Sequence, residues 1–97
     1  MIEGKTKSGF KYSIDERILS DWRMLEAIHA SESEDASEQL GGITKLTDLL
    51  LGKNKSKFME HIAKKNDGFV PSEAVTAEIT EMFTKVKELK NSQSSQE

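Results

Sequence analysis

Apolar residues recur at helical spacing in four stretches of this chain and at strand spacing in one. The helical stretches are residues 15–30, 40–51, 56–65 and 72–90. A strand-like alternation precedes them, and the turn pair Ser8-Gly9 lies just before it, so residues 2–14 are expected to form a short hairpin. We therefore predict a mostly α fold, with about four helices and an N-terminal β-hairpin in one small domain of residues 1–90.

Residues that favour helix ends stand where these helices should begin and end. Asp15 suits the N-cap of the first helix, Gly52 can adopt the left-handed conformation after the second, and Pro71 introduces the fourth. Residues 31–37 are acidic and have no apolar period, which indicates an exposed loop between the first two helices. Residues 91–97 are polar and are expected to be a disordered tail.

One apolar face of each helix is expected to form the core, with Trp22 contributing the most buried area. The residues predicted to be buried are Trp22, Leu25, Ile28, Leu46, Leu50, Ile62, Ile79, Met82 and Phe83. The three leucines at 49–51 are consecutive, and a helix cannot point all of them inward. We therefore expect one of them, Leu51, to be partly exposed or to contact a partner.

Composition fits one small domain with a thin core: 97 residues, of which 35 % are hydrophobic and 32 % charged. The sequence contains no cysteine, which excludes disulfides and cysteine-ligated zinc. The longest apolar run, the leucines at 49–51, is far shorter than the roughly 20 residues that span a bilayer. The first residues also lack the apolar run of a signal peptide, so we expect a cytosolic protein without a membrane segment.

Charge bears on one alternative function, DNA binding. The second and third predicted helices and the turn at Gly52 have the outline of a helix-turn-helix. Lysines gather there, namely Lys53, Lys55, Lys57, Lys64 and Lys65. The net charge is nevertheless −3, Glu60 interrupts the lysines, and no arginine or asparagine array is present to contact base edges. We therefore do not expect nucleic-acid binding and retain a small DNA-binding regulator as the alternative.

The sequence shows no pattern typical of a catalytic, cofactor or metal site. No nucleophile stands beside a base, and Gly41-Gly42 lacks the flanks of a phosphate-binding loop. His29 and His61 fall on different predicted helices and are expected to be structural. The acidic segment 31–37 lacks the alternating ligands and mid-loop glycine of calcium loops. We expect no enzymatic activity, no metal and no cofactor.

The order of these features resembles the tail assembly chaperones of siphophages and prophages of Gram-positive bacteria. The resemblance covers about residues 10–90, and the motifs that carry it are FKYSID at 10–15, WRMLE at 22–26, TDLLLG at 47–52 and DGFVPSE at 67–73. These motifs are typical of a fold rather than of a catalytic site. The resemblance implies a chaperone that binds the long, helical tape measure protein and helps tail tube protein to polymerise around it. It also implies action in the cytoplasm of the bacterial host and absence from the mature virion.

Three residues are candidates for the partner contact on their own chemistry. Leu49 and Leu51 belong to the leucine run that the core cannot fully enclose, and Met59 has the flexible side chain that adapts to varied partners. No binding residue of the family can be matched to this sequence one by one. Another phage structural or adaptor protein remains a further alternative to the chaperone.

Overall fold

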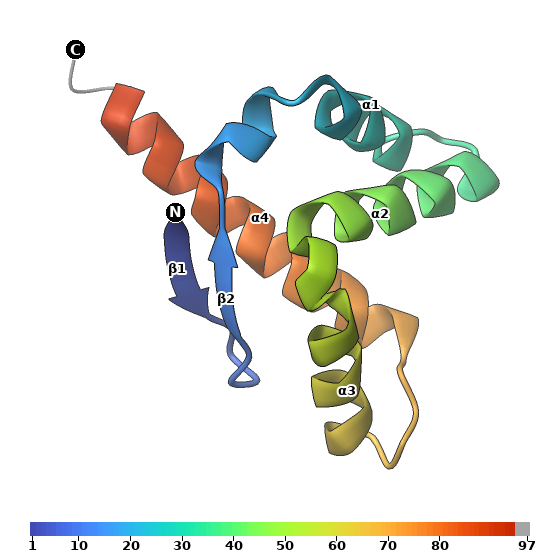
Figure 1. Cartoon of the computed structure of the whole chain (residues 1–97). Helices are drawn as coiled ribbons and strands as arrows, with labels where there is room; N and C mark the ends of the chain where they lie inside the picture. Colours follow the sequence, from blue (N-terminus) through green and yellow to red (C-terminus); the bar gives the residue numbers. More distant parts are fainter. Residues whose placement is uncertain (95–97) are drawn as a thin grey trace.

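The mostly helical fold with an N-terminal hairpin is confirmed by a computed structural model, which describes the backbone of residues 1–94 and the side chains of residues 1–89 (Figure 1). Four α-helices and two short 3₁₀ helices, η1 and η2, follow the hairpin. In chain order the elements are β1 (Ile2–Lys5), β2 (Lys11–Ile14), η1 (Glu16–Ser20), α1 (Trp22–Ser31), α2 (Ala36–Leu51), η2 (Gly52–Asn54), α3 (Lys55–Lys65) and α4 (Ser72–Ser94).

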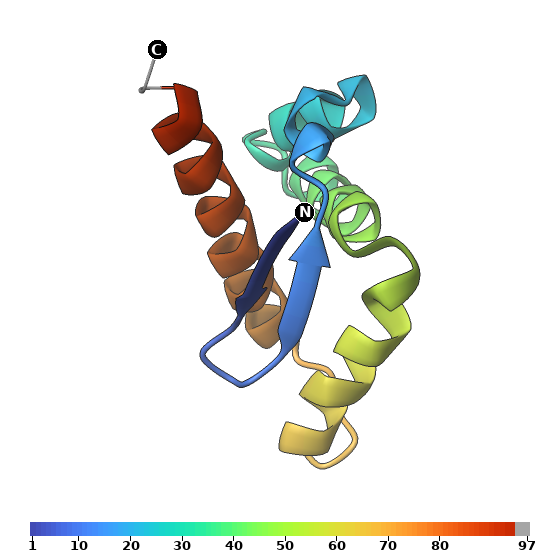
Figure 2. The same ribbon diagram turned by 60° about the vertical axis from the view of Figure 1, so that its left-hand side comes forward.

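The two strands are antiparallel, and Ile2 pairs with Ile14 at the open end of the hairpin. Gly9 has a φ of 98° in the turn, a conformation that glycine adopts without steric cost. Alternation along β2 buries Tyr12 and Ile14 and leaves Lys11 and Ser13 exposed. The hairpin lies beside α4, with α2 and α3 on its other side (Figures 1 and 2). A two-stranded sheet is marginal alone, so these helices stabilise it.

The first predicted helix is in fact two elements, η1 and α1, because Asp21 has an extended backbone with a ψ of 128°. Its carboxylate accepts a hydrogen bond from the backbone N–H of Arg23 at 2.8 Å, which caps α1. The side chain of Arg23 donates to the same carboxylate at 2.7 Å. These hydrogen bonds favour the charged form and lower the pKa of Asp21 to about 2.

The break at Asp21 changes which face of α1 is buried. Met24 and Ala27 face the core, whereas Trp22 is 72 % exposed and Leu25 is 45 % exposed, so the predicted burial of Trp22 and Leu25 was wrong. The apolar spacing that begins at Ile18 crosses the break, and residues on its two sides no longer share a face. The rest of the predicted set is buried or half-buried in the core: Ile28, Leu46, Leu50, Ile62, Ile79, Met82 and Phe83.

Helices α1 and α2 form a closely packed helical pair whose backbones meet at Gly42. A Cβ atom at Gly42 would lie only 2.8 Å from the carbonyl oxygen of Ala27, so glycine permits the close approach. Helix α2 begins at Ala36, capped by Asp35, rather than at residue 40. The acidic segment is therefore a short turn between two helix ends and not a long loop.

The end of α2 is more enclosed than the sequence predicts. Gly52 has a φ of 54° and a ψ of −127°, which turns the chain directly into η2 and α3. Both α3 and β2 contact α2, so more than one side of its last turn is covered. Leu51 is only 6 % exposed, and the prediction that it is exposed was wrong.

Helix α4 runs across the other elements, and its buried residues Met82 and Val86 join Met24 and Phe58 at the centre of the core (Figure 1). It begins at Ser72, as predicted, and continues to Ser94. Of the predicted disordered tail 91–97, residues 91–94 thus continue the helix, and residues 95–97 lie outside the described residues. Among residues 1–94, no helix is both long and apolar enough to cross a membrane.

Candidate functional site

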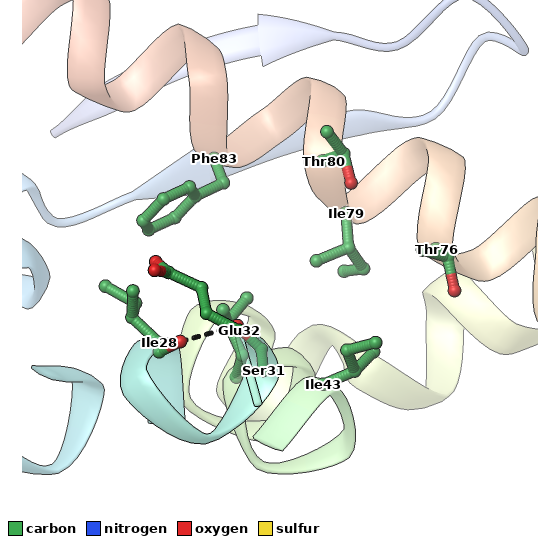
Figure 3. Close-up of a pocket in the computed structure, with 9 residues that line it drawn as sticks. Ile28, Ser31, Glu32, Ile43, Thr76, Ile79, Thr80 and Phe83 are labelled. Atoms are coloured by element: carbon green, nitrogen blue, oxygen red, sulfur yellow. Dashed lines mark hydrogen bonds between the residues drawn. The ribbon is translucent and has the colours of Figure 1, made fainter. Parts of the chain in front are cut away.

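Two adjoining apolar hollows lie along the side of α4 that faces α1 and α2. The first has a volume of about 230 Å³ and lies between α1, α2 and α4 (Figure 3). Figure 3 shows Phe83 and Ile79 of α4 facing Ile28 of α1 and Glu32, which directly follows α1, across it. Its lining residues are Ile28, Ser31, Glu32, Ile43, Leu46, Thr76, Ile79, Thr80 and Phe83.

The second hollow has a volume of about 190 Å³ and lies between α2 and the beginnings of α3 and α4. Ile43 and Thr76 line both hollows, so the two are continuous, and we name them together the α2–α4 groove. The lining residues of the second hollow are Leu40, Ile43, Thr44, Thr47, Lys55, Met59, Ser72, Val75 and Thr76.

Apolar side chains dominate the α2–α4 groove and are only partly covered. Ile79 and Leu46 are buried at its base, while Ile43 and Phe83 are half-buried. Leu40 is 60 % exposed at the mouth of the second hollow. Partly exposed apolar side chains that line one continuous depression are typical of a binding surface.

The two ends of the groove differ in charge. Glu32 lines the first hollow, and the exposed Glu34 follows it in the turn before α2. Lys55 lines the second hollow, where its ammonium group pairs with the carboxylate of Asp48. Helix α1 ends at the first hollow, whereas α3 and α4 begin at the second. The end of α1 therefore adds negative potential at the first hollow, and the beginnings of α3 and α4 add positive potential at the second. The dipole of α2 offsets part of both, because α2 begins in the turn after Glu32 and ends shortly before Lys55.

Of the three predicted partner-binding residues, only Met59 lines the groove. Leu49 is half-buried and packs against the core, and Leu51 is itself part of the core. Sequence patterns missed Ile43, Thr76 and Phe83 as groove residues. The apolar spacing that includes Ile43 and Phe83 is visible, but nothing in it shows that a gap remains between α4 and the α1–α2 pair.

A polar cluster joins the hairpin turn to α3 and α4. The hydroxyl of Ser8 donates to Oε1 of Glu78 at 2.7 Å, and its Oγ lies 2.9 Å from Nε2 of His61. Because Ser8 gives its one proton to Glu78, His61 donates its Nε2–H to the hydroxyl oxygen. Glu78 is buried, with 7 % of its surface exposed, so this hydrogen bond satisfies a carboxylate shielded from water.

Serine, histidine and a carboxylate also make up the triad of many hydrolases, but these three are connected differently. In a triad the serine donates to the imidazole, and the carboxylate binds the other ring nitrogen. Here the carboxylate and Nε2 both contact the hydroxyl, so the imidazole does not take the serine proton. Ser8 is 53 residues from His61 and 70 from Glu78, which explains why no local motif predicted the cluster.

The lysines of α3 bear on the DNA-binding alternative. α2, the three-residue η2 and α3 keep the outline of a helix-turn-helix. Lys57 and Lys64 are exposed and two turns apart, and the exposed Glu60 lies between them on the same face. A carboxylate in the middle of this face opposes contact with phosphates.

In the described part of the chain, no three histidine, cysteine or acidic side chains are grouped so that they could hold a metal ion. No protein-family model matches the sequence, and no match was found among curated proteins or among solved structures.

Proposed function

We propose that this protein is a phage tail assembly chaperone that binds a helical segment of the tape measure protein in the α2–α4 groove. Binding keeps the tape measure protein soluble in the host cytoplasm until tail tube protein assembles around it. The chaperone then leaves, so that the mature virion does not contain it. The proposed role needs no catalytic residue, metal or cofactor.

The continuous apolar groove is the observation that supports this proposal most directly. An amphipathic helix that binds in such a groove inserts apolar residues spaced along one of its faces. From Ser72 to Phe83 the groove follows α4 for about 16 Å, at about 1.5 Å per residue, which is the length of about three helical turns.

The chemistry of a long helical partner also fits. Such a protein exposes apolar stripes along its length before it is packed, and these stripes associate with one another in water. A small, acidic domain that covers one stripe at a time lowers the exposed apolar area and adds like charge, both of which oppose aggregation. The family resemblance supplies the identity of the partner, and the groove supplies the mode of binding.

Thr76 and Thr84 offer a matched pair of variants for testing the groove. Both are exposed on α4, but Thr76 lies where the two hollows meet, whereas Thr84 lines a polar cleft beside the hairpin. Thr76→Glu places a carboxylate in the apolar groove, and Thr84→Glu adds the same charge on another face. Each variant is co-expressed with the tape measure protein encoded beside it, and the soluble fraction of that protein is measured.

We expect wild type and Thr84→Glu to keep the tape measure protein soluble and Thr76→Glu to lose most of this effect. A carboxylate that cannot be solvated in a closed apolar contact opposes binding strongly. If the tape measure protein is equally soluble without this chain, the chaperone proposal is wrong. If the groove captures a different tail protein in the same assay, an adaptor role replaces the chaperone role.

A further inference from the structure

We propose that the α2–α4 groove binds its partner helix in one direction only, with the N-terminus of that helix at the first hollow and its C-terminus at the second. The partner helix then carries basic residues in its first turn and acidic residues in its last turn. Its two apolar anchors, one for each hollow, are seven residues apart. This inference rests on the proposed function, because it takes the groove to be a helix-binding site.

The first hollow is the acidic end of the groove. Glu32 lines it, and the exposed residues Glu34 and Asp35 follow in the same turn. The carbonyl end of α1 lies there too, since Ser31, the last residue of that helix, also lines the hollow. On the opposite wall, Lys87 lies over the ring of Phe83 at 5.6 Å and offsets part of this negative charge.

The second hollow is the basic end. Lys55, the first residue of α3, and Ser72, the first residue of α4, both line it, so the positive ends of two helix dipoles are directed to this region. Lys53 and Lys57 are exposed on either side of Lys55 in the sequence. Asp48 pairs with Lys55 and offsets part of this charge.

A helix in the groove has a dipole of its own, positive at its N-terminus and negative at its C-terminus. Both ends of that dipole are stabilised when the partner runs antiparallel to α4, from the first hollow to the second. The stretches of α4 that line the two hollows, 76–83 and 72–76, have midpoints about 8 Å apart along the helix axis. Partner residues seven positions apart are separated by about 10 Å, so they reach both hollows from one face.

Charge also argues against α3 or α4 of a second copy of this chain as the occupant. α4 has Glu73 in its first turn and Lys85 and Lys87 further along, the reverse of the pattern that the groove favours. α3 ends with Lys64 and Lys65, which would lie against the basic end. Neither of these two helices of a second copy matches the groove, and the proposed occupant is a helix of another protein.

Two synthetic peptides of about 15 residues, long enough for about four helical turns, provide the test. Both carry two leucines seven positions apart and have the same composition and zero net charge. The forward peptide has two lysines in its first turn and two glutamates in its last, and the reversed peptide exchanges them. The reversed peptide is the more stable helix in isolation, because its glutamates lie at the positive end of its own dipole and its lysines at the negative end. Higher helicity therefore cannot explain tighter binding of the forward peptide.

Affinities are measured by calorimetry with the full chain, and the position of binding by methyl NMR of Ile28, Ile43 and Ile79. We expect the forward peptide to bind about tenfold tighter at low salt, since each charge at a helix end contributes about twofold to fivefold. Glu32→Lys should reduce this preference about fivefold or more. The matched control is Glu26→Lys, which lies on α1 but beside a hollow on the other side of the α1–α2 pair, and it should leave the preference unchanged.

The possible failures are distinguishable. If both peptides shift the groove methyl signals with equal affinity, or if the reversed peptide binds tighter, the directional inference is wrong and helix binding in the groove remains. An equal effect of Glu32→Lys and Glu26→Lys also contradicts the inference, because it shows a response to net charge alone. If neither peptide shifts the groove methyl signals, both the direction and the proposed binding site are wrong.

Discussion

Gly41 and Gly42 are neighbours in α2, yet an added methyl group would have opposite effects at the two positions. A Cβ atom at Gly41 meets nothing within 4 Å. At Gly42 it would lie 2.7 Å from the carbonyl carbon of Ala30 and 2.8 Å from the carbonyl oxygen of Ala27. The same substitution, glycine to alanine, thus tests how closely the backbones of α1 and α2 approach each other.

The two effects can be estimated separately. Replacing glycine by alanine inside a helix stabilises it by about 0.8–1.0 kcal/mol, and this gain applies at both positions. At Gly42 the contacts at 2.7–2.8 Å would have to relax to an ordinary 3.4–4 Å, which moves α1 away by roughly 1 Å. Overpacking of this kind costs about 1–3 kcal/mol, and backbone atoms cannot rotate away as a side chain can. We expect Gly41→Ala to be about 1 kcal/mol more stable than wild type and about 1–3 kcal/mol more stable than Gly42→Ala.

Thermal unfolding followed by circular dichroism measures the difference. For a domain of this size, 1 kcal/mol corresponds to about 4–8 °C, so the melting temperature of Gly42→Ala should be at least about 4 °C below that of Gly41→Ala. Because α1 forms one wall of the groove, Gly42→Ala should also weaken helix binding, whereas Gly41→Ala should not. If Gly42→Ala raises the melting temperature as much as Gly41→Ala does, α1 and α2 are not in backbone contact at this position.

Five further outcomes can be measured. Trp22→Ala should change the free energy of unfolding by less than about 1 kcal/mol, because the ring is 72 % exposed. Met24→Ala should lower the free energy of unfolding by about 2–5 kcal/mol, because Met24 is fully buried. Equal losses for Trp22→Ala and Met24→Ala would contradict the assignment of the Met24 face of α1 to the core. Ser8→Ala should cost about 1–3 kcal/mol in chemical denaturation, because it leaves the buried Glu78 without that donor, and Ser8→Thr should restore part of the loss. The pKa of Asp21 should be about 2 by NMR titration. Because this pKa in the folded state lies below the unfolded value of about 3.9, the stability that Asp21 contributes is present above pH 4 and is lost as the pH falls toward 2. Duplex DNA should not bind at physiological salt, and a tight complex whose affinity falls with a log–log slope near −0.9 per phosphate would favour the regulator.

Local sequence accounts for much of the secondary structure. Gly52 was expected to follow the second helix, and it does so with a positive φ. Ser72 after a proline begins α4, and the alternation from residue 11 to residue 14 forms β2. These features depend on backbone preferences and on periods of a few residues, so the chain carries them without reference to distant contacts.

Packing between distant segments accounts for what the sequence did not reveal. Apolar spacing shows which residues share a face, but the extended backbone at Asp21 shifted the buried face of α1 from Trp22 to Met24. Leu51 is buried because α3 and β2 both contact α2, the helix that it ends. The α2–α4 groove also depends on packing between distant segments, because its apolar side chains are left only partly covered by the neighbouring elements. A periodic stripe supplies apolar side chains, but only the positions of the neighbouring elements determine which are covered and which are left facing a gap.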